Sequence, residues 1–509
     1  MSSKLLGIDI GTSSLKSSIY NIEGSLLGTS MESYQILQAH TTWAEHDPNL
    51  WWRALANTLR RALKQARVKA RDIAGIGIDC FAPSLVPIDR KGNALRNAFT
   101  PLDVRSTEEV AEINNKMGAN RIFEITGNRL ATGTSSLPNI IWIRKHEKKI
   151  AKNTWRFVHA NSYISYRLTG ICKMDWSNAA LTLMFDQEKR SWSTEIIDKF
   201  QVAIDKLPDL CAPTEVVGEV TGQEAKRIGL RSGTPVAAGA IDTNCGALGS
   251  GVTKEGQAVD SGGAASCLGV VTDAPHFDNR FLNRVHAVPN KWIIVSQGPH
   301  SGIALRWFRD EFCKTELAEA SRRRVDPYWI MDEEAKKSPP GSNGIIFLPY
   351  FMGESSPTWN PFSTSVFFGV SPGQSKGDFI RAILEGTAFN IRENLEVLSE
   401  LGVEVNELRA IGGQSKSRLW RKLRADITGT KIVVPKIKDA TPLGSAILGG
   451  VAAGIFTNPE VAADKICEIE ETIQPEPETH QRYEEYYNLY KQVYRDLIAS
   501  FKARANILA

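Results

Sequence analysis

A strand–turn–strand pattern near the start of the chain constrains the fold most strongly, because the same pattern returns in the second half. Lys4 to Ile10 is an apolar run typical of a buried strand. A polar turn, Gly11-Thr12-Ser13-Ser14, follows it, and Lys16 to Ile22 has the composition of a second strand. Small side chains in the turn let backbone N–H groups approach an anion closely. The segment is therefore a candidate phosphate-binding hairpin.

The second copy of the pattern opens the second half of the chain. Gln257 to Ser261 and Leu268 to Thr272 are short strand-like runs that flank a turn of small residues, Gly262-Gly263-Ala264-Ala265-Ser266. One such hairpin is a weak indication of function. Two of them, at the start of each half, predict a duplicated α/β domain that closes around a nucleotide.

Helix and strand patterns of an α/β protein fill the rest of the chain. Asp47-Pro48-Asn49 is a helix-capping sequence, and apolar residues from Leu50 to Ala66 recur near helical spacing. The tyrosines between Tyr483 and Tyr494 lie on an expected terminal helix that starts at Pro477, and such a stripe is far more typical of packing than of a cofactor site. The other predicted elements are strands at 73–78, 234–238, 408–411 and 431–434 and a small-residue helix at 442–454.

Composition excludes several classes of protein. The 509-residue chain is 42% hydrophobic and 23% charged, and its net charge of +4 gives no strong field for nucleic acid or membrane. Its seven cysteines lie far apart without a C-x-x-C pair, which favours reduced thiols over disulfides or structural zinc. The N-terminus lacks the apolar region of a signal peptide, and no apolar run is long enough to span a bilayer. We therefore expect a cytoplasmic protein of at least two domains, with no nucleic-acid or membrane partner.

Asp9 is the first residue that could carry chemistry. It ends the first strand just before the Gly-Thr-Ser-Ser turn, and an acid in that place commonly holds a Mg²⁺ ion that keeps several waters. The alternative is a carboxylate that caps the N–H groups of its own turn, and local sequence does not separate the two. Thr12, Ser13 and Ser14 add hydroxyl donors, and Lys16 adds a cation, although a solvated strand lysine is the plainer interpretation.

Asp242 is the second candidate. A buried apolar strand delivers it to the start of a Gly/Ala-rich segment, Ala238 to Ala247. Taken alone, this position is more typical of a helix-capping aspartate. Its place shortly before the second hairpin, and the small residues after it, favour a role in which it accepts a proton from an attacking sugar hydroxyl.

A third candidate is the turn Gly412-Gly413-Gln414-Ser415-Lys416-Ser417, which follows a strand and is expected to open a helix. Its glycines and N-terminal N–H groups suit the phosphate or ribose of a nucleotide. Tight strand-to-helix turns need glycine in any case, so the signal is weak. The two common nucleotide-binding loops, G-x-x-x-x-G-K-[ST] and G-x-G-x-x-G, are absent from the sequence.

With these pieces placed, the chain resembles the FGGY family of carbohydrate kinases, relatives of actin, hexokinase and the heat-shock chaperone ATPases. The likeness runs nearly from end to end. The segments that carry it are Gly7 to Ser13, Trp43 to Pro48 with Trp51-Trp52, Gly239 to Asp242, Phe347 to Tyr350, Gly353 to Pro357, Phe367 to Gly369, Arg381 to Gly386, and Gly412-Gly413.

The resemblance implies an α/β fold of two ribonuclease-H-like (actin/hexokinase-type) domains with ATP and sugar in an inter-domain cleft. We place the domains at 1–248 (sugar binding, first phosphate hairpin) and 249–475 (nucleotide binding), followed by a C-terminal helix at 476–509. By similarity Asp242 is the general base and Asp9 holds Mg²⁺ through water. Asp103, with Arg105 beside it, falls where related kinases hold sugar hydroxyls. The positions that look like nucleotide contacts are Thr12, Ser13, Gly263, Gly302, Arg306, Gly413 and Ser417.

The pattern, including Arg306-Trp307-Phe308-Arg309-Asp310, is most similar to the xylulose-kinase-like branch. Xylulose kinases carry Met-His-Gly in the sugar pocket, whereas the matching stretch here is Phe81-Ala82-Pro83-Ser84, without the imidazole. Gly263-Ala264-Ala265 replaces the usual Gly-Thr-Ser or Gly-Thr-Thr, which removes a phosphate donor worth about 1–2 kcal/mol. The expected substrate is a pentulose such as D-xylulose. Glycerol, ribulose, erythritol or gluconate, or a catalytically weak sugar or nucleotide sensor, are the alternatives, and a homodimer is common in the family.

Overall fold

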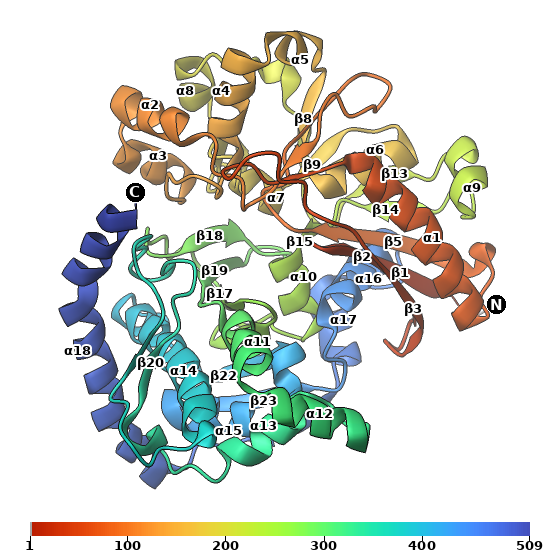
Figure 1. Ribbon diagram of the computed structural model, residues 1–509. Helices are drawn as coiled ribbons and strands as arrows, with labels where there is room; N and C mark the ends of the chain where they lie inside the picture. Colours follow the sequence, from red (N-terminus) through yellow and green to blue (C-terminus); the bar gives the residue numbers. More distant parts are fainter. Residues whose placement is uncertain (1–2, 509) are drawn as a thin grey trace. The chain divides into compact units, whose positions relative to one another are not determined.

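The computed structural model describes residues 3–508, which form two compact units (Figure 1). The first unit contains the chain up to Thr253 together with Asp273–Ile294 and Asp439–Cys467. The second contains Lys254–Thr272, Val295–Lys438 and the chain from Glu468 onward. Each unit thus combines segments that are distant in the sequence. Within residues 3–508, every helix is too short or too polar to cross a bilayer.

The first unit is built on a mixed sheet with the strand order β13-β14-β5-β1-β2-β3, and β15 also pairs with β5. β1 and β2 form the predicted antiparallel hairpin, and β5 lies parallel to β1 on its other side. The second strand of the hairpin starts at Ser14 rather than at Lys16, because Leu15 already pairs with Ile10. The bounds of these strands are β1 Lys4–Ile10, β2 Ser14–Asn21, β3 Leu26–Ser33, β5 Ile73–Cys80, β13 Val216–Glu219, β14 Pro235–Ala237 and β15 Ala240–Ile241.

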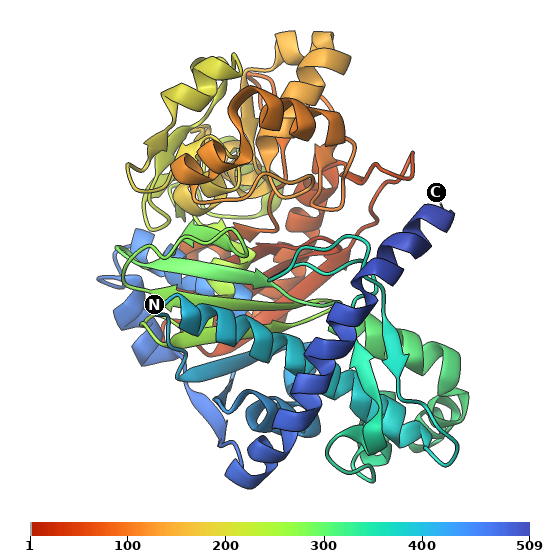
Figure 2. The same cartoon turned by 90° about the vertical axis from the view of Figure 1, so that its left-hand side faces the viewer.

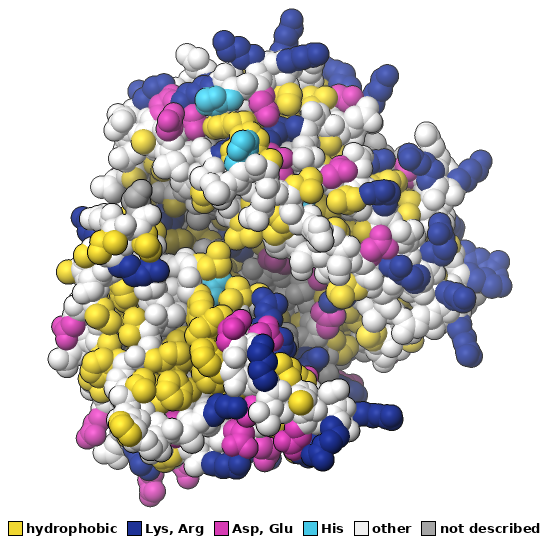
Figure 3. Space-filling model, viewed as in Figure 1, with side chains coloured by type: hydrophobic (Ala, Val, Ile, Leu, Met, Phe, Trp, Pro, Cys, Tyr) yellow, Lys and Arg dark blue, Asp and Glu magenta, His cyan; other side chains and the backbone are white. Residues whose placement is uncertain are grey.

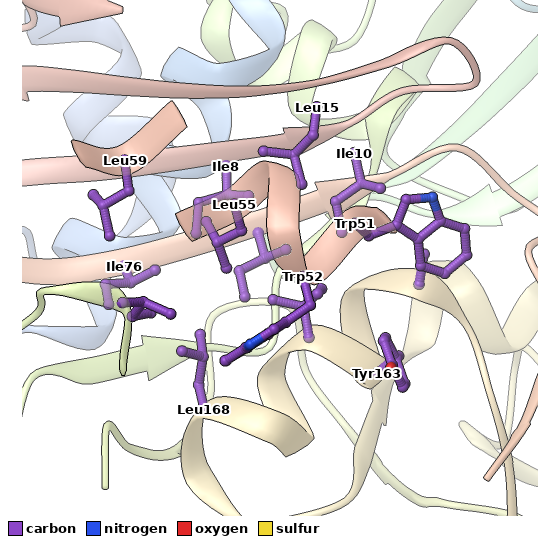
Figure 4. Packing of buried hydrophobic residues seen from close by; sticks show 14 of the residues in the cluster. Ile8, Ile10, Leu15, Trp51, Trp52, Leu55, Leu59, Ile76, Tyr163 and Leu168 are labelled. Carbon is purple, nitrogen blue, oxygen red and sulfur yellow. The ribbon is translucent and has the colours of Figure 1, made fainter. Parts of the chain in front are cut away.

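Helix α1 (Pro48–Ala66) covers one face of this sheet. The carboxylate of Asp47 caps it by accepting a hydrogen bond from the Asn49 N–H at 2.9 Å, as the capping sequence predicts. Its buried residues meet alternate residues of the strands, among them Ile8 and Ile10 of β1 (Figure 4). This packing forms the largest apolar core of the unit.

Helix α16 (Ala440–Ala452) packs against β1 and β5 on the opposite face. Glycine is required at the contact, since a Cβ on Gly77 would lie 1.7 Å from the Ser445 carbonyl oxygen and one on Gly7 would lie 1.9 Å from that of Pro442. Because side chains alternate along a strand, Asp9 shares this face with Gly7. The close approach of α16 explains why the segment predicted at 442–454 consists of small residues.

The remaining part of the first unit is a helix-rich region with its own core around Ile140, Ile141 and Phe99. Short strands tie it together, for example β6 (Val86–Ile88) with β8 (Arg156–Val158). The other elements of the first unit, of which α10 and α17 pack with α16, are β4 Glu45–His46, β7 Ala98–Phe99, α2 Thr107–Met117, α3 Ala119–Thr126, α4 Ser136–His146, α5 Lys148–Asn153, α6 Ala160–Thr169, β9 Lys173–Asp175, α7 Trp176–Ala180, β10 Phe185–Asp186, β11 Ser191–Trp192, α8 Thr194–Lys199, β12 Asp209–Cys211, α9 Gly222–Ile228, α10 Asp242–Gly249, β18 Leu282–Val285 and α17 Pro459–Ile466.

The second unit repeats the hairpin-led sheet, in the order β17-β16-β22-β23-β24. β16 and β17 form the second predicted hairpin, and β22 lies parallel to β16. This is the arrangement of β1, β2 and β5 in the first unit, so the predicted duplication is present in the fold. The strands are β16 Gln257–Gly262, β17 Ser266–Thr272, β22 Glu407–Gly412, β23 Lys431–Pro435 and β24 Ile469–Ile473, with β19 Trp292–Gln297 at the boundary between the units.

Helices enclose the sheet of the second unit. The terminal helix α18 (Pro477–Leu508) is a single long helix, dark blue in Figure 2, and its tyrosines are buried in the core, where Tyr490 hydroxyl meets that of Tyr350 at 2.5 Å. Apolar side chains also reach the surface near α11 and α14 (Figure 3), and Phe312 is 52% exposed. The other elements are α11 Ser301–Phe312, α12 Lys314–Arg323, α13 Pro327–Ala335, β20 Ile346–Leu348, β21 Val366–Phe368, α14 Lys376–Glu400 and α15 Arg418–Thr428.

Candidate active site

Asp9 lies at the end of β1, on the face that α16 covers. It stands in register with Lys16 across the hairpin and with Asp79 on β5. Burial raises the pKa of Asp9 to about 6, although the charge of Lys16 opposes this rise, and the charge of Asp242 adds to it. The first hairpin and its parallel neighbour thus bring two carboxylates together at one sheet edge.

Lys16 is the cation of this edge. Its Nζ donates to both carboxylate oxygens of Asp439 at 2.7 and 2.8 Å, so the amine is held at the start of α16. In the turn, Tyr34 N–H donates to the Ser13 carbonyl at 2.9 Å, whereas the hydroxyls of Ser13 and Thr12 form no hydrogen bond with residues 3–508. The turn therefore presents hydroxyl donors, as the sequence suggested, while Lys16 is already paired.

Asp242 is the first residue of α10, directly after β15. Because β15 pairs with the end of β5, with Ile241 beside Cys80, Asp242 comes to the same sheet edge as Asp79. Its Oδ1 accepts the Thr243 N–H at 2.6 Å and the Thr243 hydroxyl at 3.1 Å. Burial raises the pKa of Asp242, and the positive charge of Arg284 counteracts the shift.

Three acids therefore meet at the carboxyl ends of β1, β5 and β15: Asp9, Asp79 and Asp242. The sequence reasoning singled out the first and the last and missed Asp79. The sequence does contain a signal for Asp79. The apolar strand predicted at 73–78 is followed directly by this acid, and the strand from Lys4 to Ile10 likewise has an acid, Asp9, near its end. The register that pairs Asp79 with Asp9 is a long-range property that the local pattern does not contain.

The acids fit a hydrated Mg²⁺ ion better than a caged metal. Within residues 3–508, no group of three or more His, Cys, Asp and Glu side chains is placed to hold a metal. Mg²⁺ keeps most of its waters and needs only one or two carboxylates besides substrate phosphates. Asp79 Oδ1 is buried and has no hydrogen-bond partner. An unsatisfied carboxylate oxygen beside Asp9 is what a cation or its waters would satisfy.

The predicted sugar contacts Asp103 and Arg105 lie in a separate cluster and bond to each other. Asp103 Oδ2 accepts the Ala44 N–H at 2.8 Å and an Arg105 N–H at 2.5 Å, and Arg105 also donates to Glu45 at 2.6 Å. The guanidinium lies 3.7 Å from the ring centre of Trp43. Both side chains are buried, at 0% and 1% exposed, and Arg105 Nη1 has no hydrogen-bond partner among residues 3–508. Pro83 is buried as well, after β5.

In the second unit, the five predicted nucleotide-contact residues come together around one pocket of about 530 Å³, a volume suited to a nucleotide-sized ligand. Three aromatic side chains that the sequence reasoning did not include, Tyr328, Trp329 and Trp420, also line it. The predicted residues at this pocket are Gly263, Gly302, Arg306, Gly413 and Ser417.

The β16–β17 turn forms one wall of this pocket. Gly263 N–H donates to the Ala265 carbonyl at 3.0 Å, and the Ala264 carbonyl accepts the Ile303 N–H of α11 at 3.0 Å. Helix α11 lies so close that a Cβ on Gly302 would sit 2.1 Å from the Gly263 carbonyl oxygen. Glycine is therefore required at position 302, whereas a Cβ on Gly263 would approach the Ala265 carbonyl oxygen only to 3.8 Å.

The side chain of Gln414 holds the same turn through hydrogen bonds. Its Nε2 donates to the Gly263 carbonyl at 2.8 Å and to the Ser301 hydroxyl at 2.6 Å. Its Oε1 accepts a hydrogen bond from Arg424, which also pairs with Asp260 of β16 at 2.5 Å. Since Arg424 and Asp260 are each 1% exposed, a buried ion pair fixes the amide that holds the turn.

Ser417 plays a local structural part as well as lining the pocket. Residues Gly413–Lys416 form one 3₁₀ turn, so α15 begins later than expected, at Arg418. The Ser417 hydroxyl accepts the Trp420 N–H at 3.0 Å and so caps the helix. It also interacts with Asp332, whose pKa burial raises to about 6.

Comparison with known proteins identifies this arrangement. Residues 4–249 match the N-terminal domain of the FGGY family of carbohydrate kinases, and residues 258–453 match the C-terminal domain. The chain belongs to this family. It is a sugar kinase, and the expected α/β fold of two actin/hexokinase-type domains is confirmed. Carbohydrate kinases of this family take the phosphoryl group from ATP.

Relatives of this FGGY kinase differ in the substrate that they are named for. A xylulose kinase of Staphylococcus epidermidis is 30% identical over 496 residues, 96% of each chain. An autoinducer-2 kinase of Escherichia coli is 29% identical over 503 residues, which cover 97% of this chain and 94% of the relative. The crystal structure of gluconate kinase from Lactobacillus acidophilus has a TM-score of 0.89 at 23% identity and covers 99% of this chain and 100% of its own, a likeness of fold.

Proposed function

We propose that this FGGY kinase transfers the γ-phosphoryl group of ATP to a hydroxyl of a pentulose such as D-xylulose, with Asp242 as the general base. The observation that carries this proposal is the Asp242 carboxylate at the β15–α10 junction. In the described part of the chain, Oδ1 accepts both of its hydrogen bonds from Thr243, which leaves Oδ2 to accept a proton. A raised pKa makes the carboxylate a stronger base at neutral pH.

In the proposed reaction the sugar hydroxyl attacks the γ-phosphorus, the bond to the leaving ADP breaks, and the hydroxyl proton passes to Asp242. Thr243 holds the carboxylate through its N–H and its hydroxyl, so the base is oriented before the sugar arrives. The positive charge of Arg284 favours the ionised carboxylate and so opposes the larger effect of burial on the pKa of Asp242. The residues thus supply orientation and proton acceptance.

We further propose that Asp9 holds Mg²⁺ through water. The ion supplies neutralisation of the negative charge on the transferred phosphoryl group. Thr12, Ser13 and Ser14 offer donors to the phosphates from the first hairpin, and Lys16 contributes its charge from the Asp439 ion pair.

The nucleotide is proposed to occupy the pocket of the second unit. Gly263 and Gly413 let backbone approach the phosphates, Gly302 and Ser417 complete the wall, and Arg306 adds a positive charge. The aromatic residues give the purine apolar surface to pack on. As functional domains we retain 1–248 for sugar, 249–475 for nucleotide, and 476–509 as the terminal helix, and we propose that sugar binding brings the first two together and excludes water.

The choice of a pentulose is supported by the xylulose kinase relatives, which are up to 30% identical over nearly the full length. Pro83 in place of the usual imidazole makes the pocket less polar there. Asp103 and Arg105 are retained as substrate residues in this proposal. Asp103 fixes the loop beside the sugar through its bonds to Ala44 and Arg105, and Arg105 keeps Nη1 without a partner among residues 3–508. A cytoplasmic homodimer is the expected form of the enzyme.

The test is a coupled ADP-release assay with D-xylulose, ribulose, glycerol, erythritol and gluconate. Saturable, sugar-dependent turnover that is highest with a pentulose supports the proposal. Higher kcat/KM with glycerol, erythritol or gluconate would overturn the pentulose assignment and leave the kinase activity in place.

A catalytically weak sugar or nucleotide sensor is the second candidate, and Ala264 with Ala265 favours it by removing hydroxyl donors from the turn. Retention of Asp9 and Asp242 speaks against it, since a sensor needs neither acid. A thermal-shift screen with the same sugars and a non-hydrolysable ATP analogue separates the two. Ligand-induced stabilisation without turnover of any sugar would favour the sensor.

A further inference from the structure

Asp79 is the acid at this sheet edge to which the proposed reaction gives no role. It lies near the end of β5, beside Asp9 in the register of parallel strands, and is 0% exposed. Its Oδ2 accepts the Ser445 hydroxyl at 2.5 Å, and among residues 3–508 no donor reaches its Oδ1. A buried carboxylate oxygen without a donor is costly, because the lost hydration is not replaced.

The backbone position of Asp79 beside Asp9 is fixed by the packing of β5. Gly75 and Gly77 precede it on the same face of β5, and α16 packs directly on them, which fixes the strand against the helix. When both carboxylates are ionised, neither has a hydrogen to offer the other. Burial is the main cause that raises the pKa of Asp79, and the negative charge of Asp9 raises it further. Both effects disfavour two ionised carboxylates side by side.

The charges around this edge do not balance. The carboxylates of Asp9, Asp79, Asp242 and Asp439 interact with one another, and Lys16 and Arg284 are the cations that face them. Among the charged groups that meet here within residues 3–508, carboxylates therefore outnumber cations, which favours a bound cation over a bound anion.

We propose that Asp79 is a second carboxylate of the divalent-cation site, and that it binds the ion or its waters through Oδ1 alongside Asp9. The inference deepens the proposed function and rests on it, since the cation is the one that accompanies the nucleotide. Two carboxylates and several waters form an ordinary environment for Mg²⁺. Ser445 holds Oδ2, so the free oxygen is oriented before the ion arrives.

The competing explanation is a buried acid that stays protonated, donates a hydrogen bond to the Asp9 carboxylate and accepts one from Ser445. The two explanations predict different results for Asp79→Asn. An amide has the shape and the neutral charge of the protonated acid, so it would preserve a purely structural role. It would not preserve attraction for a cation.

The experiment measures binding of Mn²⁺ alone to the full chain by the loss of the free-ion electron paramagnetic resonance signal. Asp79→Asn is expected to weaken Mn²⁺ binding about tenfold or more, with an unfolding temperature no lower than that of the wild type. Ser445→Ala is the matched control, because it removes the hydrogen bond to Asp79 and keeps the charge. Because Ser445 orients the carboxylate, Ser445→Ala should also weaken Mn²⁺ binding, but by less than Asp79→Asn, which removes the ligand itself.

Unchanged Mn²⁺ affinity in Asp79→Asn would overturn the inference, as would equal losses in Asp79→Asn and Ser445→Ala. The absence of Mn²⁺ binding to the wild type would overturn it too. ADP release measured in parallel keeps this result separate from the proposed function. A wild-type enzyme that turns over sugar while Asp79→Asn binds Mn²⁺ normally refutes only the assignment of Asp79, whereas a wild type inactive with every sugar refutes the proposed reaction.

Discussion

Replacing Arg424 by leucine should destabilise the second unit strongly. The change leaves the Asp260 carboxylate, which is 1% exposed, without its partner, and it takes a donor from Gln414. Breaking a buried ion pair on one side costs about 3–5 kcal/mol, because the remaining charge stays desolvated. At about 2–4 °C per kcal/mol for a unit of this size, the melting temperature should fall by roughly 10 °C.

The double variant Asp260→Leu/Arg424→Leu tests whether the isolated charge is the cause. Removing both charges eliminates the uncompensated carboxylate, so we expect the double variant to be at least about 2 kcal/mol more stable than Arg424→Leu alone. Urea unfolding followed by tryptophan fluorescence suits the measurement, since Arg424 lies 5.0 Å from the ring centre of Trp420. The reasoning is refuted if Arg424→Leu loses less than about 1 kcal/mol, or if the double variant is no more stable than the single one.

Three further predictions concern the turn and the base. Gly302→Ala should raise the KM for ATP, because the new Cβ would lie 2.1 Å from the Gly263 carbonyl oxygen and would displace the turn that lines the pocket. Steady-state kinetics that match the wild type would contradict this. Ala264→Thr should lower the KM for ATP about fivefold to tenfold by returning a phosphate donor, and calorimetric titration with ADP checks it, with no gain as the contrary result. The acid limb of kcat/KM should lie above pH 3.8, the ordinary value for aspartate, since burial raises the pKa of Asp242 and only the ionised form accepts a proton; a rate that stays flat down to pH 3.8 would exclude this.

The sequence predicted those elements whose signals are local. The two hairpins, the capped helix α1 and the terminal helix follow from turn composition and periodicity within short windows, and their observed bounds differ by one or two residues. The later start of α15 has a local cause too, because Ser417 caps the helix and leaves Gly413–Lys416 as a separate turn.

Features that depend on long-range contacts were harder to foresee. Asp79 is a candidate site residue because it is in register with Asp9, 70 residues earlier, and because α16 packs closely on its strand. The hydrogen bonds of Asp103 come from Ala44 and Arg105, and Arg105 also donates to Glu45. The aromatic wall of the second pocket is built from α13 and α15, which no local pattern connects.

The central claim is that the Asp242 carboxylate removes the proton from the attacking sugar hydroxyl. The measurement that tests it most directly is kcat of Asp242→Asn with the best sugar, together with ADP affinity by calorimetry. The account predicts a loss in kcat on the order of 100- to 10,000-fold with nucleotide affinity close to that of the wild type. Turnover by Asp242→Asn within about threefold of the wild type would contradict it.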